Sequence, residues 1–298
     1  MMDIPGHPSD APPLLTVGMS VYNAGDFLRE AVLSVVRQTF CDWELLLLDD
    51  GSTDGAVEGI ADIADPRIRV IRDGENHGLA ARLNQAVSLA RGKYFARMDQ
   101  DDICHPERFE RQLAYLAAHP ETDLLGTKCV TIDEAGEISG SLPFAADHED
   151  LCRRPWTGFY IPHPTWMGPV AWFKKHGYAS PGPYFCEDQE LLLRSHKDSR
   201  FHVLSEPLLA YRMPGRWRWG KRLRTRTTLL RIQVAHFAAR GELLFALLAV
   251  LATVTRIFRD LFAAAGLAGR STVQELEILG ESGRFLKYWR SFGSGCVL

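Results

Sequence analysis

Short apolar runs alternate with amphipathic segments over the first 120 residues of the chain. Apolar runs that stop at turn residues are typical of buried strands, and apolar residues at every third or fourth position are typical of helices. The predicted strands cover residues 14–19, 43–48, 67–72 and 94–98, and the predicted helices cover 27–38, 55–64, 79–90 and 106–119. This alternation predicts an α/β fold: a Rossmann-like, twisted, mostly parallel sheet flanked by helices.

The pattern changes after residue 120. Residues 123–132 and 138–142 surround Glu134-Ala135-Gly136 and predict a β-hairpin, and helical and loop pieces follow to about Arg212. We therefore expect one domain over residues 14–213. A polar, proline-rich and flexible lead precedes it at 1–13, and a basic and apolar helical extension follows it at 214–298.

Two acidic clusters directly follow predicted strands. Asp49-Asp50-Gly51-Ser52-Thr53-Asp54 ends the second strand, and Asp99-Gln100-Asp101-Asp102 ends the fourth. In open α/β sheets, ligands bind at the carboxyl ends of the strands. Two acidic clusters at one rim repel each other unless a cation lies between them, so the pattern predicts a divalent metal.

The composition is that of an ordinary globular protein with 298 residues, 46% of them hydrophobic, and a net charge of −3. Its six cysteines are scattered without a CxxC pair, which favours reduced thiols in the cytoplasm over disulfides or a zinc site. The N-terminus lacks the apolar core of a signal peptide. Neither GxGxxG nor GxxxxGK[ST] occurs, which argues against a dinucleotide fold and a P-loop.

An ordered set of motifs resembles the family 2 glycosyltransferases with the GT-A fold. The motifs are Thr16-Val17-Gly18-Met19-Ser20-Val21-Tyr22-Asn23, Ser34-Val35-Val36-Arg37-Gln38-Thr39, Leu48-Asp49-Asp50-Gly51-Ser52-Thr53-Asp54, Asn76-His77-Gly78-Leu79-Ala80, Asn84-Gln85-Ala86, Ala90-Arg91-Gly92-Lys93-Tyr94, Met98-Asp99-Gln100-Asp101-Asp102, Pro106-Glu107-Arg108, His163-Pro164-Thr165, Glu187-Asp188-Gln189-Glu190-Leu191 and Tyr211-Arg212. They span about residues 14–213 in the family's order and spacing. Ser20 departs from the family, since many members have proline there. The resemblance implies a GT-A catalytic domain that transfers a sugar with inversion from a nucleoside diphosphate.

The resemblance makes Asp99 and Asp101 the D-x-D pattern that holds Mg²⁺ or Mn²⁺. Asp101 is then the direct ligand, and Asp99 bridges to the ribose or shares the metal. A divalent cation on the diphosphate stabilises the charge of the leaving group. The residues alone also fit a solvated acidic turn that caps the next helix.

The same resemblance implies a nucleotide cleft for a UDP-, GDP- or TDP-sugar, lined by Val21, Tyr22 and Asn23, with Asp50 hydrogen-bonded to the base. Arg82 is expected either to touch the diphosphate or to face solvent on its helix. Asp54 is more simply the N-cap of the helix that we expect from Gly55.

An inverting transfer needs a general base opposite the leaving group. The resemblance places it on Glu187-Asp188, with Asp188 the base, and puts His163 near the sugar and the acceptor. Asp188 and Glu187 also fit the acidic first turn of a helix over 188–194, where the helix dipole would keep Asp188 ionised. A histidine between prolines is also a common structural feature.

The extension lies outside the resemblance. Nine Lys and Arg residues and no acid lie between Pro207 and Gly241, which indicates a polyanionic partner. Residues 243–254 are almost wholly apolar but are shorter than the ~20 residues of a membrane span. Two interpretations are open: peripheral membrane contact through 214–262, on the cytoplasmic leaflet, or a helical pair packed on the catalytic domain or another subunit. Nucleic acid is disfavoured because no binding module frames the basic run.

The sequence thus predicts a metal-dependent glycosyltransferase that acts on a saccharide or lipid-linked acceptor in the synthesis of cell-surface polysaccharide. Two rivals are a sugar nucleotidyltransferase, which would need a glycine- and lysine-rich triphosphate loop, and a non-catalytic nucleotide-sugar-binding subunit of a membrane polysaccharide complex.

Overall fold

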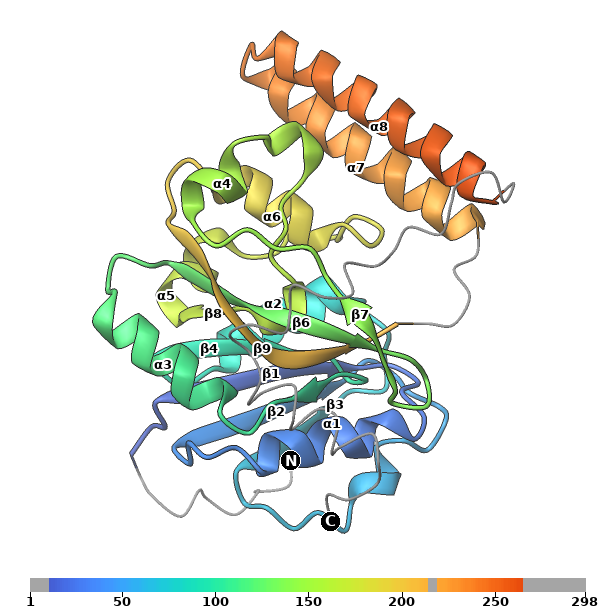
Figure 1. Cartoon of the computed structure of the whole chain (residues 1–298). Coiled ribbons are helices and arrows are strands. Elements are labelled where there is room, and N and C mark those ends of the chain that lie inside the picture. The colour runs from blue at the N-terminus through green and yellow to red at the C-terminus, as the bar shows by residue number, and fades with distance from the viewer. Residues whose placement is uncertain (1–10, 214–218, 265–298) are drawn as a thin grey trace.

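The computed structural model describes residues 11–213 and 219–264, in which one curved sheet carries helices on both faces (Figure 1). The strands are β1 (Leu15–Val21), β2 (Trp43–Asp49), β3 (Ile68–Arg72), β4 (Tyr94–Met98), β5 (Ile103–Cys104), β6 (Leu124–Ile132), β7 (Ile138–Ser141), β8 (Met167–Pro169) and β9 (Phe201–Arg212). The helices are α1 (Phe27–Val36), α2 (Leu79–Leu89), α3 (Arg108–Ala118), α4 (His148–Cys152), α5 (Val170–His176), α6 (Glu187–Ser195), α7 (Trp219–Ala239) and α8 (Leu243–Ala264), with 3₁₀ turns η1 (Glu58–Ile60), η2 (Pro155–Thr157) and η3 (His163–Thr165).

The strands follow the order β3-β2-β1-β4-β8-β6-β9-β5, and β7 pairs with β6 outside this path. The first four are mutually parallel, β8 runs antiparallel to both of its neighbours, and β6 and β9 pair in parallel. The prediction of an α/β fold with a mostly parallel sheet is therefore confirmed, as is the hairpin formed by β6 and β7.

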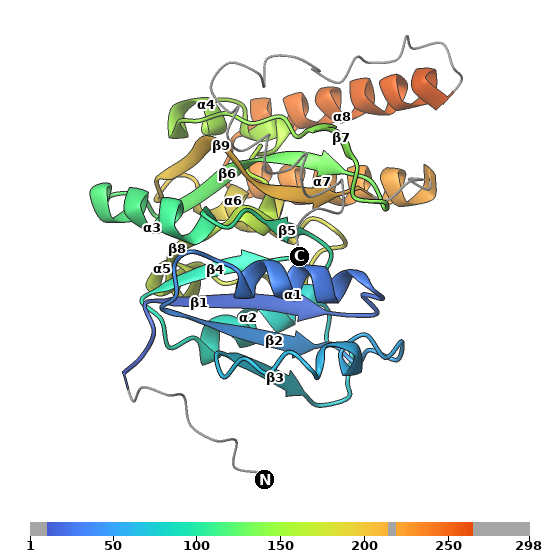
Figure 2. The same ribbon diagram turned by 60° about the horizontal axis from the view of Figure 1, so that its bottom comes forward.

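The strand register brings the two acidic clusters to one edge of the sheet. Val21 at the end of β1 pairs with Asp49 on β2, and Met19 pairs with Met98 at the end of β4. The carboxyl ends of these parallel strands consequently lie on one side of the molecule, where the arrowheads point in Figure 2. The residues that follow each strand meet there, as expected for a ligand-binding rim.

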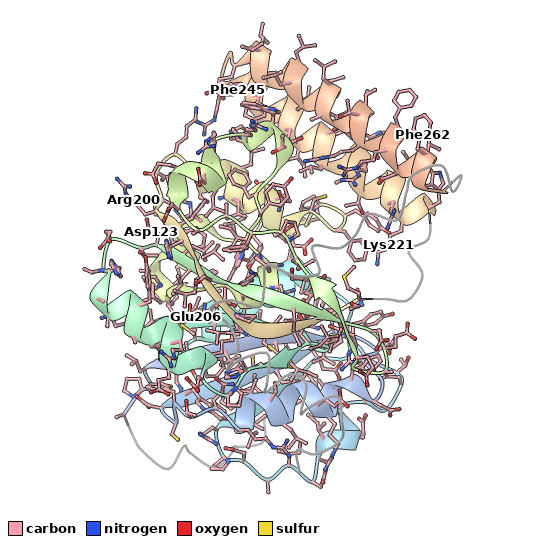
Figure 3. The ribbon with its side chains drawn as sticks, in the orientation of Figure 1. Asp123, Arg200, Glu206, Lys221, Phe245 and Phe262 are labelled. Carbon is pink, nitrogen blue, oxygen red and sulfur yellow. The ribbon has the colours of Figure 1, made fainter. Side chains whose placement is uncertain are left out.

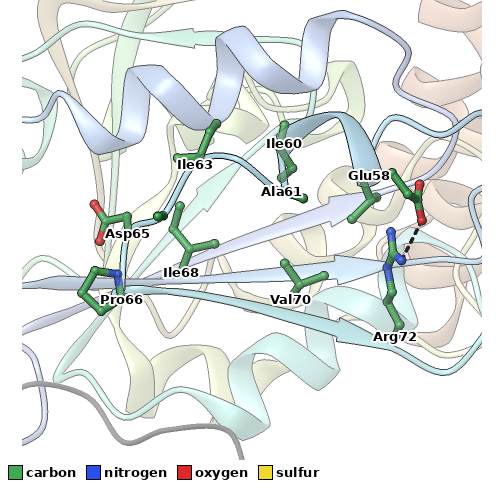
Figure 4. Close-up of a pocket in the computed structure, with 11 residues that line it drawn as sticks. Glu58, Ile60, Ala61, Ile63, Asp65, Pro66, Ile68, Val70 and Arg72 are labelled. Atoms are coloured by element: carbon green, nitrogen blue, oxygen red, sulfur yellow. Dashed lines mark hydrogen bonds and ion pairs between the residues drawn. The ribbon is translucent and has the colours of Figure 1, made fainter.

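The expected helix over 55–64 is wrong, because the structure has only the single turn η1 in that segment. Gly55 adopts a left-handed φ of 78°, and the Asp54 carboxylate accepts hydrogen bonds from Ala56 N and Gly25 N, so Asp54 closes a turn and tethers the loop after β1. The shortened connection leaves an open depression of about 850 Å³ beside β3 (Figure 4). This depression lies on the edge strand, and only Arg72 at its end reaches an acidic-cluster residue, Asp49.

Two apolar cores lie on opposite faces of the sheet. One packs α1 and α3 against β1 and β2, and the other packs α2, α5 and α6 and includes Phe237 of α7. Phe237 is fully buried, and α7 contacts both α6 and α8. The helical pair predicted for the extension therefore packs on the catalytic domain, although residues 214–218 and 265–298 lie outside the described part of the chain. No helix in the described ranges is long and apolar enough to cross a bilayer.

Candidate active site

Hydrogen bonds join the loops after β1, β2 and β4 into one rim. The Gln100 side chain accepts from Tyr22 N (2.6 Å) and donates to Tyr22 O (3.2 Å), so it pairs with the backbone as a neighbouring strand would. Asn23 accepts from Thr53 N (2.9 Å) with a left-handed φ of 48°, a conformation that asparagine tolerates. Each of these loops therefore fixes its neighbour.

The three residues expected to line the nucleotide cleft have different environments. The Tyr22 side chain is half exposed at the rim, and Asn23 is also exposed. The side chain of Val21 is fully buried in the core, so its side chain cannot line an open cleft as expected. Tyr22 is consequently the aromatic surface available for stacking at this edge.

Asp50 is held by a buried network. Its carboxylate accepts hydrogen bonds from His77 N (2.7 Å), Gly78 N (3.0 Å) and Arg82 Nε (2.9 Å), and it is 3% exposed. Arg82 also donates to the Asp73 carboxylate through Nη1 (2.7 Å). The alternative of a solvent-facing Arg82 is wrong, since this side chain is buried. Asp50 and Arg82 together fix the loop over residues 73–78, which precedes α2.

Arg97 and Asp99 form an ion pair at the end of β4. Arg97 Nη1 donates to Asp99 Oδ2, and Nη2 contacts Oδ1, so the guanidinium engages both carboxylate oxygens. Arg97 is 2% exposed, whereas the Asp99 side chain is 25% exposed. Sequence analysis missed Arg97. The signal was available, because a charged residue within an apolar buried strand requires a paired anion.

One of the two grounds for a metal was repulsion between uncompensated acidic clusters, and that premise is wrong. Arg72 lies 3.2 Å from the Asp49 carboxylate, Arg82 binds Asp50 and Arg97 binds Asp99. The charges at the rim are thus already partly neutralised by the protein. A metal at this edge must be argued from the remaining carboxylates instead.

Within the described ranges, neither Asp101 nor Asp102 of the second cluster has an arginine side chain in contact with its carboxylate. Burial and the neighbouring Asp99 raise the pKa of Asp101 to about 6, and burial raises the pKa of Asp102 well above its usual range. Asp102 accepts Arg212 N through Oδ1 (2.8 Å), and its buried Oδ2 has no hydrogen-bond partner in the described part of the chain. Oxygen donors of this kind fit a hard cation such as Mg²⁺, which takes one or two carboxylates and completes its shell with phosphate and water. Among the described residues, no three His, Cys, Asp or Glu side chains form a ready-made metal cage.

A second group of predicted site residues lies at the start of α6. Burial, and then the neighbouring Asp188, raise the pKa of Glu187 to about 7, and burial raises the pKa of Asp188. Burial of Asp188 thus opposes the ionisation that the helix start favours. Gln189 Nε2 donates to Asp188 Oδ2 (3.1 Å) and to Phe159 O (3.1 Å), while Gln189 Oε1 accepts Phe159 N (2.8 Å). Gln189, which sequence analysis did not single out, thus anchors Asp188.

His163 lies beside the start of α6. Its Nε2 is 2.8 Å from the Tyr178 hydroxyl, and its Nδ1 is 3.8 Å from Glu187 Oε1. Burial and the nearby Arg97 lower the pKa of His163 well below its usual value, so the ring is neutral. His163 is 9% exposed and is shielded by Tyr178, a partner that the sequence pattern did not indicate.

Arg97 interacts with carboxylates at two places, the end of β4 and the start of α6. Besides binding Asp99, its positive charge opposes the burial-driven rise in the pKa of Glu187 and Asp188. A single buried guanidinium therefore couples the D-x-D edge to the carboxylates of α6. The carboxylates of Asp99, Glu187 and Asp188 therefore lie close enough for their charges to interact.

The model of glycosyl transferase family 2 matches residues 16–177 of this chain, which is more than half of its length. The chain belongs to glycosyltransferase family 2. An uncharacterized glycosyltransferase of Methanocaldococcus jannaschii, MJ1057, is 32% identical over 218 residues, which cover 71% of this chain and 75% of that protein. The residues that the family model matches include the rim and the ion pair of Arg97 with Asp99.

Two relatives from Bacillus subtilis match over shorter stretches. The putative glycosyltransferase EpsE is 39% identical over 127 residues, or 42% of this chain and 46% of EpsE. The putative teichuronic acid biosynthesis glycosyltransferase TuaG is 37% identical over 106 residues, or 35% of this chain and 42% of TuaG. The chain thus matches about half the length of these relatives.

Staphylococcus aureus TarS has the same fold. Its crystal structure with UDP-GlcNAc covers 95% of this chain and 83% of the TarS chain, with a TM-score of 0.60 and 17% sequence identity. The GT-A fold expected from the motifs is therefore confirmed.

Proposed function

We propose that this glycosyltransferase is inverting and metal-dependent and that it transfers a sugar from a nucleoside diphosphate to a saccharide or lipid-linked acceptor. The proposal rests on the position of Arg97, whose guanidinium binds Asp99 at the end of β4. Its positive charge also acts on Glu187 and Asp188 at the start of α6. Two relatives, EpsE and TuaG, are putative glycosyltransferases, and TuaG is assigned to teichuronic acid biosynthesis, which supports a role in cell-surface polysaccharide synthesis.

On the donor side, Tyr22 and Asn23 would border the nucleoside, and Asp50 and Arg82 would hold the loop that closes this end of the cleft. TarS was crystallised with UDP and with UDP-GlcNAc, which supports a uridine nucleotide as the first donor to test. Asp101 would be the direct ligand of Mg²⁺ or Mn²⁺, because Arg97 already engages both oxygens of Asp99. Such an ion, when bound, stabilises negative charge on the diphosphate.

On the acceptor side, Asp188 would take the proton from the attacking hydroxyl. The acceptor oxygen then bonds to the anomeric carbon, and the electron pair of the breaking C–O bond leaves with the diphosphate. The raised pKa of Asp188 suits this role, since a base is most effective when its pKa approaches the working pH. Glu187 and His163 would shape the acceptor end, with His163 neutral and held by Tyr178.

The experiment is a transfer and hydrolysis assay with UDP-GlcNAc and other nucleotide sugars in Mn²⁺, for the native chain and Asp188→Asn. Nucleoside diphosphate released by the native chain and suppressed in Asp188→Asn would support the proposal. Donor binding without turnover by the native chain would favour the non-catalytic subunit. Formation of a nucleotide sugar from a nucleoside triphosphate would favour the nucleotidyltransferase.

A further inference from the structure

The outward face of α8 is apolar along its whole length. Nine of the 17 large apolar side chains that are exposed in the described residues belong to this helix, from Leu243 (68% exposed) to Phe262 (53%). They are Leu243, Leu244, Leu247, Val250, Leu251, Val254, Phe258, Leu261 and Phe262. At 3.6 residues per turn they cover an arc of roughly 120°. A surface helix normally turns such a stripe toward the core, so this face requires a partner.

The opposite side of α8 is already occupied. Ala249 is fully buried and Thr253 is buried, Phe245 packs on Trp156 with ring centroids 5.0 Å apart, and Arg256 donates to Thr157 O (2.6 Å). Figure 3 shows Phe245 at one end of the helical pair and Phe262 at the other. Because the inner side is fixed by these contacts, the helix cannot turn its apolar arc inward without breaking them.

The charge of the helical pair identifies the partner. Residues 219–264 contain eight Lys and Arg residues and two acids. Both acids have partners, since Asp260 lies 3.3 Å from Arg226 and Glu242 pairs with Lys197. Arg231 on α7 and Arg259 on α8 are exposed. The pair is therefore apolar and cationic together, a combination that matches the interface of an anionic bilayer.

Other occupants fit less well. A second copy docked through the same face would bring two cationic helical pairs together, since a two-fold interface opposes each patch with itself. Residues 265–298 contain four basic and three acidic residues, so that segment does not complement the charge either. A transmembrane arrangement is not supported by any helix in the described ranges.

We propose that α7 and α8 form a docking surface for an anionic lipid bilayer, with α8 lying along the interface. The apolar arc enters the boundary between headgroups and acyl chains, and the basic side chains meet lipid phosphates. The docking surface also contacts the segment before α6: the Arg224 guanidinium lies 3.8 Å from the ring centroid of Tyr184, and Lys221 Nζ lies 3.9 Å from that of Phe185. These two aromatics directly precede Cys186 and the start of α6. A docked enzyme would thus present Asp188 to an acceptor anchored in the same membrane, a consequence that rests on the proposed function.

Vesicle flotation with the full chain tests this surface. The native chain is expected to float with vesicles that contain phosphatidylglycerol and to bind pure phosphatidylcholine vesicles more weakly.

Leu247→Asp with Leu251→Asp should lower the bound fraction about tenfold or more, because both side chains lose favourable burial. Leu89→Asp with Ile138→Asp is the matched control, since these exposed apolar residues lie on α2 and β7. Arg231→Glu with Arg259→Glu should weaken binding to phosphatidylglycerol vesicles specifically and make the remaining binding less sensitive to salt.

Equal flotation of the native chain and the Leu247/Leu251 variant would overturn the proposal, as would absence of binding to phosphatidylglycerol vesicles. A dimer that becomes monomeric in that variant, without vesicle binding by either, would assign the face to a second copy. Nucleotide binding is measured in the same samples. If the Leu247/Leu251 variant no longer floats but still binds nucleotide, the docking surface is separate from the active site. If the native chain does not bind nucleotide, that result counts against the proposed function alone.

Discussion

Arg97 holds Asp99 through both terminal nitrogens of its guanidinium, although the two residues are only two positions apart at the end of β4. The arginine is almost completely buried, and its Nε has no hydrogen-bond partner among the residues that the structure describes. A buried cation in this position is stable because the acidic cleft surrounds it. It orients Asp99 and engages both of its carboxylate oxygens, whereas the Asp101 carboxylate has no such partner among the described residues.

Replacing Arg97 by methionine should destabilise the fold by about 3 kcal/mol, because carboxylates in the cleft lose their buried counter-ion. Urea unfolding measures the change. Arg29→Met is the matched control: Arg29 makes a similar two-pronged pair with Asp62 at the surface, and its loss should change stability little. Equal effects of the two substitutions would contradict the role of burial at Arg97.

Asp188→Asn should preserve nucleotide binding and lower the rate of transfer by about 10²–10⁴-fold, the usual contribution of a general base. Turnover and calorimetry on the same preparation separate the two effects. Asp198→Asn, which changes an exposed carboxylate paired with Lys175, should leave both unchanged. A fully active Asp188→Asn enzyme would remove Asp188 from the base role.

The acid limb of the kcat/KM profile should move in opposite directions in two variants. Glu187→Gln removes a neighbouring negative charge and should shift the limb to lower pH. Gln189→Leu removes the hydrogen bond that lowers the pKa of Asp188 and should shift the limb to higher pH, by about half a unit or more. Shifts of the same sign in both variants would contradict the assignment of this limb to Asp188.

Glu187 should make stability depend on pH. Its pKa is raised from about 4.5 to about 7 in the folded chain, so the folded state holds the proton more tightly than the unfolded state. The resulting stability is fully present below pH 4.5 and is lost as the pH rises through 7. Glu187→Gln should therefore be more stable than the native chain at pH 8, by about 3 kcal/mol, and similar to it near pH 4.5. Thermal unfolding at both pH values provides the comparison.

Arg82→Met should loosen the loop over 73–78 and weaken nucleotide binding without touching the proposed base. Arg82 binds Asp50, Asp73 and the carbonyl of Glu75, so its removal leaves buried acceptors unpaired and should cost about 3 kcal/mol. Hydrogen exchange over 73–78 and calorimetry follow the two effects. Unchanged exchange in this loop would show that Arg82 does not hold it.

The parallel half of the sheet was predictable because its strands are short, mainly apolar segments that end at turn residues. Residues 94–98 were placed without error, and the acidic residues after β2 and β4 share a rim as their positions required. The segment 55–64 was misjudged because its helical spacing ignored the left-handed Gly55 and the turn closed by Asp54. In this segment the backbone conformation of Gly55 and the hydrogen bonds of Asp54 determine the structure, and the spacing of apolar residues does not.

The electrostatics of the site depended on pairs that are distant in sequence. Arg82 is 32 residues from Asp50, and periodicity on α2 could not reveal which face meets a buried carboxylate. The role of Gln189 depends on Phe159, a contact across 30 residues. The D-x-D residues and Asp188 could be selected by resemblance, but their altered pKa values follow from burial, which only the folded chain defines.

We propose above all that this chain binds a nucleoside diphosphate together with a divalent cation at the edge formed by Asp99 and Asp101. The most direct test is calorimetric titration of the full chain with UDP, and then with GDP and TDP, with Mn²⁺ present and after its removal by EDTA. We predict saturable binding of at least one of these nucleotides in Mn²⁺, strongly weakened by EDTA and by Asp101→Asn but not by Asp198→Asn. Absence of binding of all three nucleotides in Mn²⁺, or equal binding by the native chain and Asp101→Asn, would contradict the account.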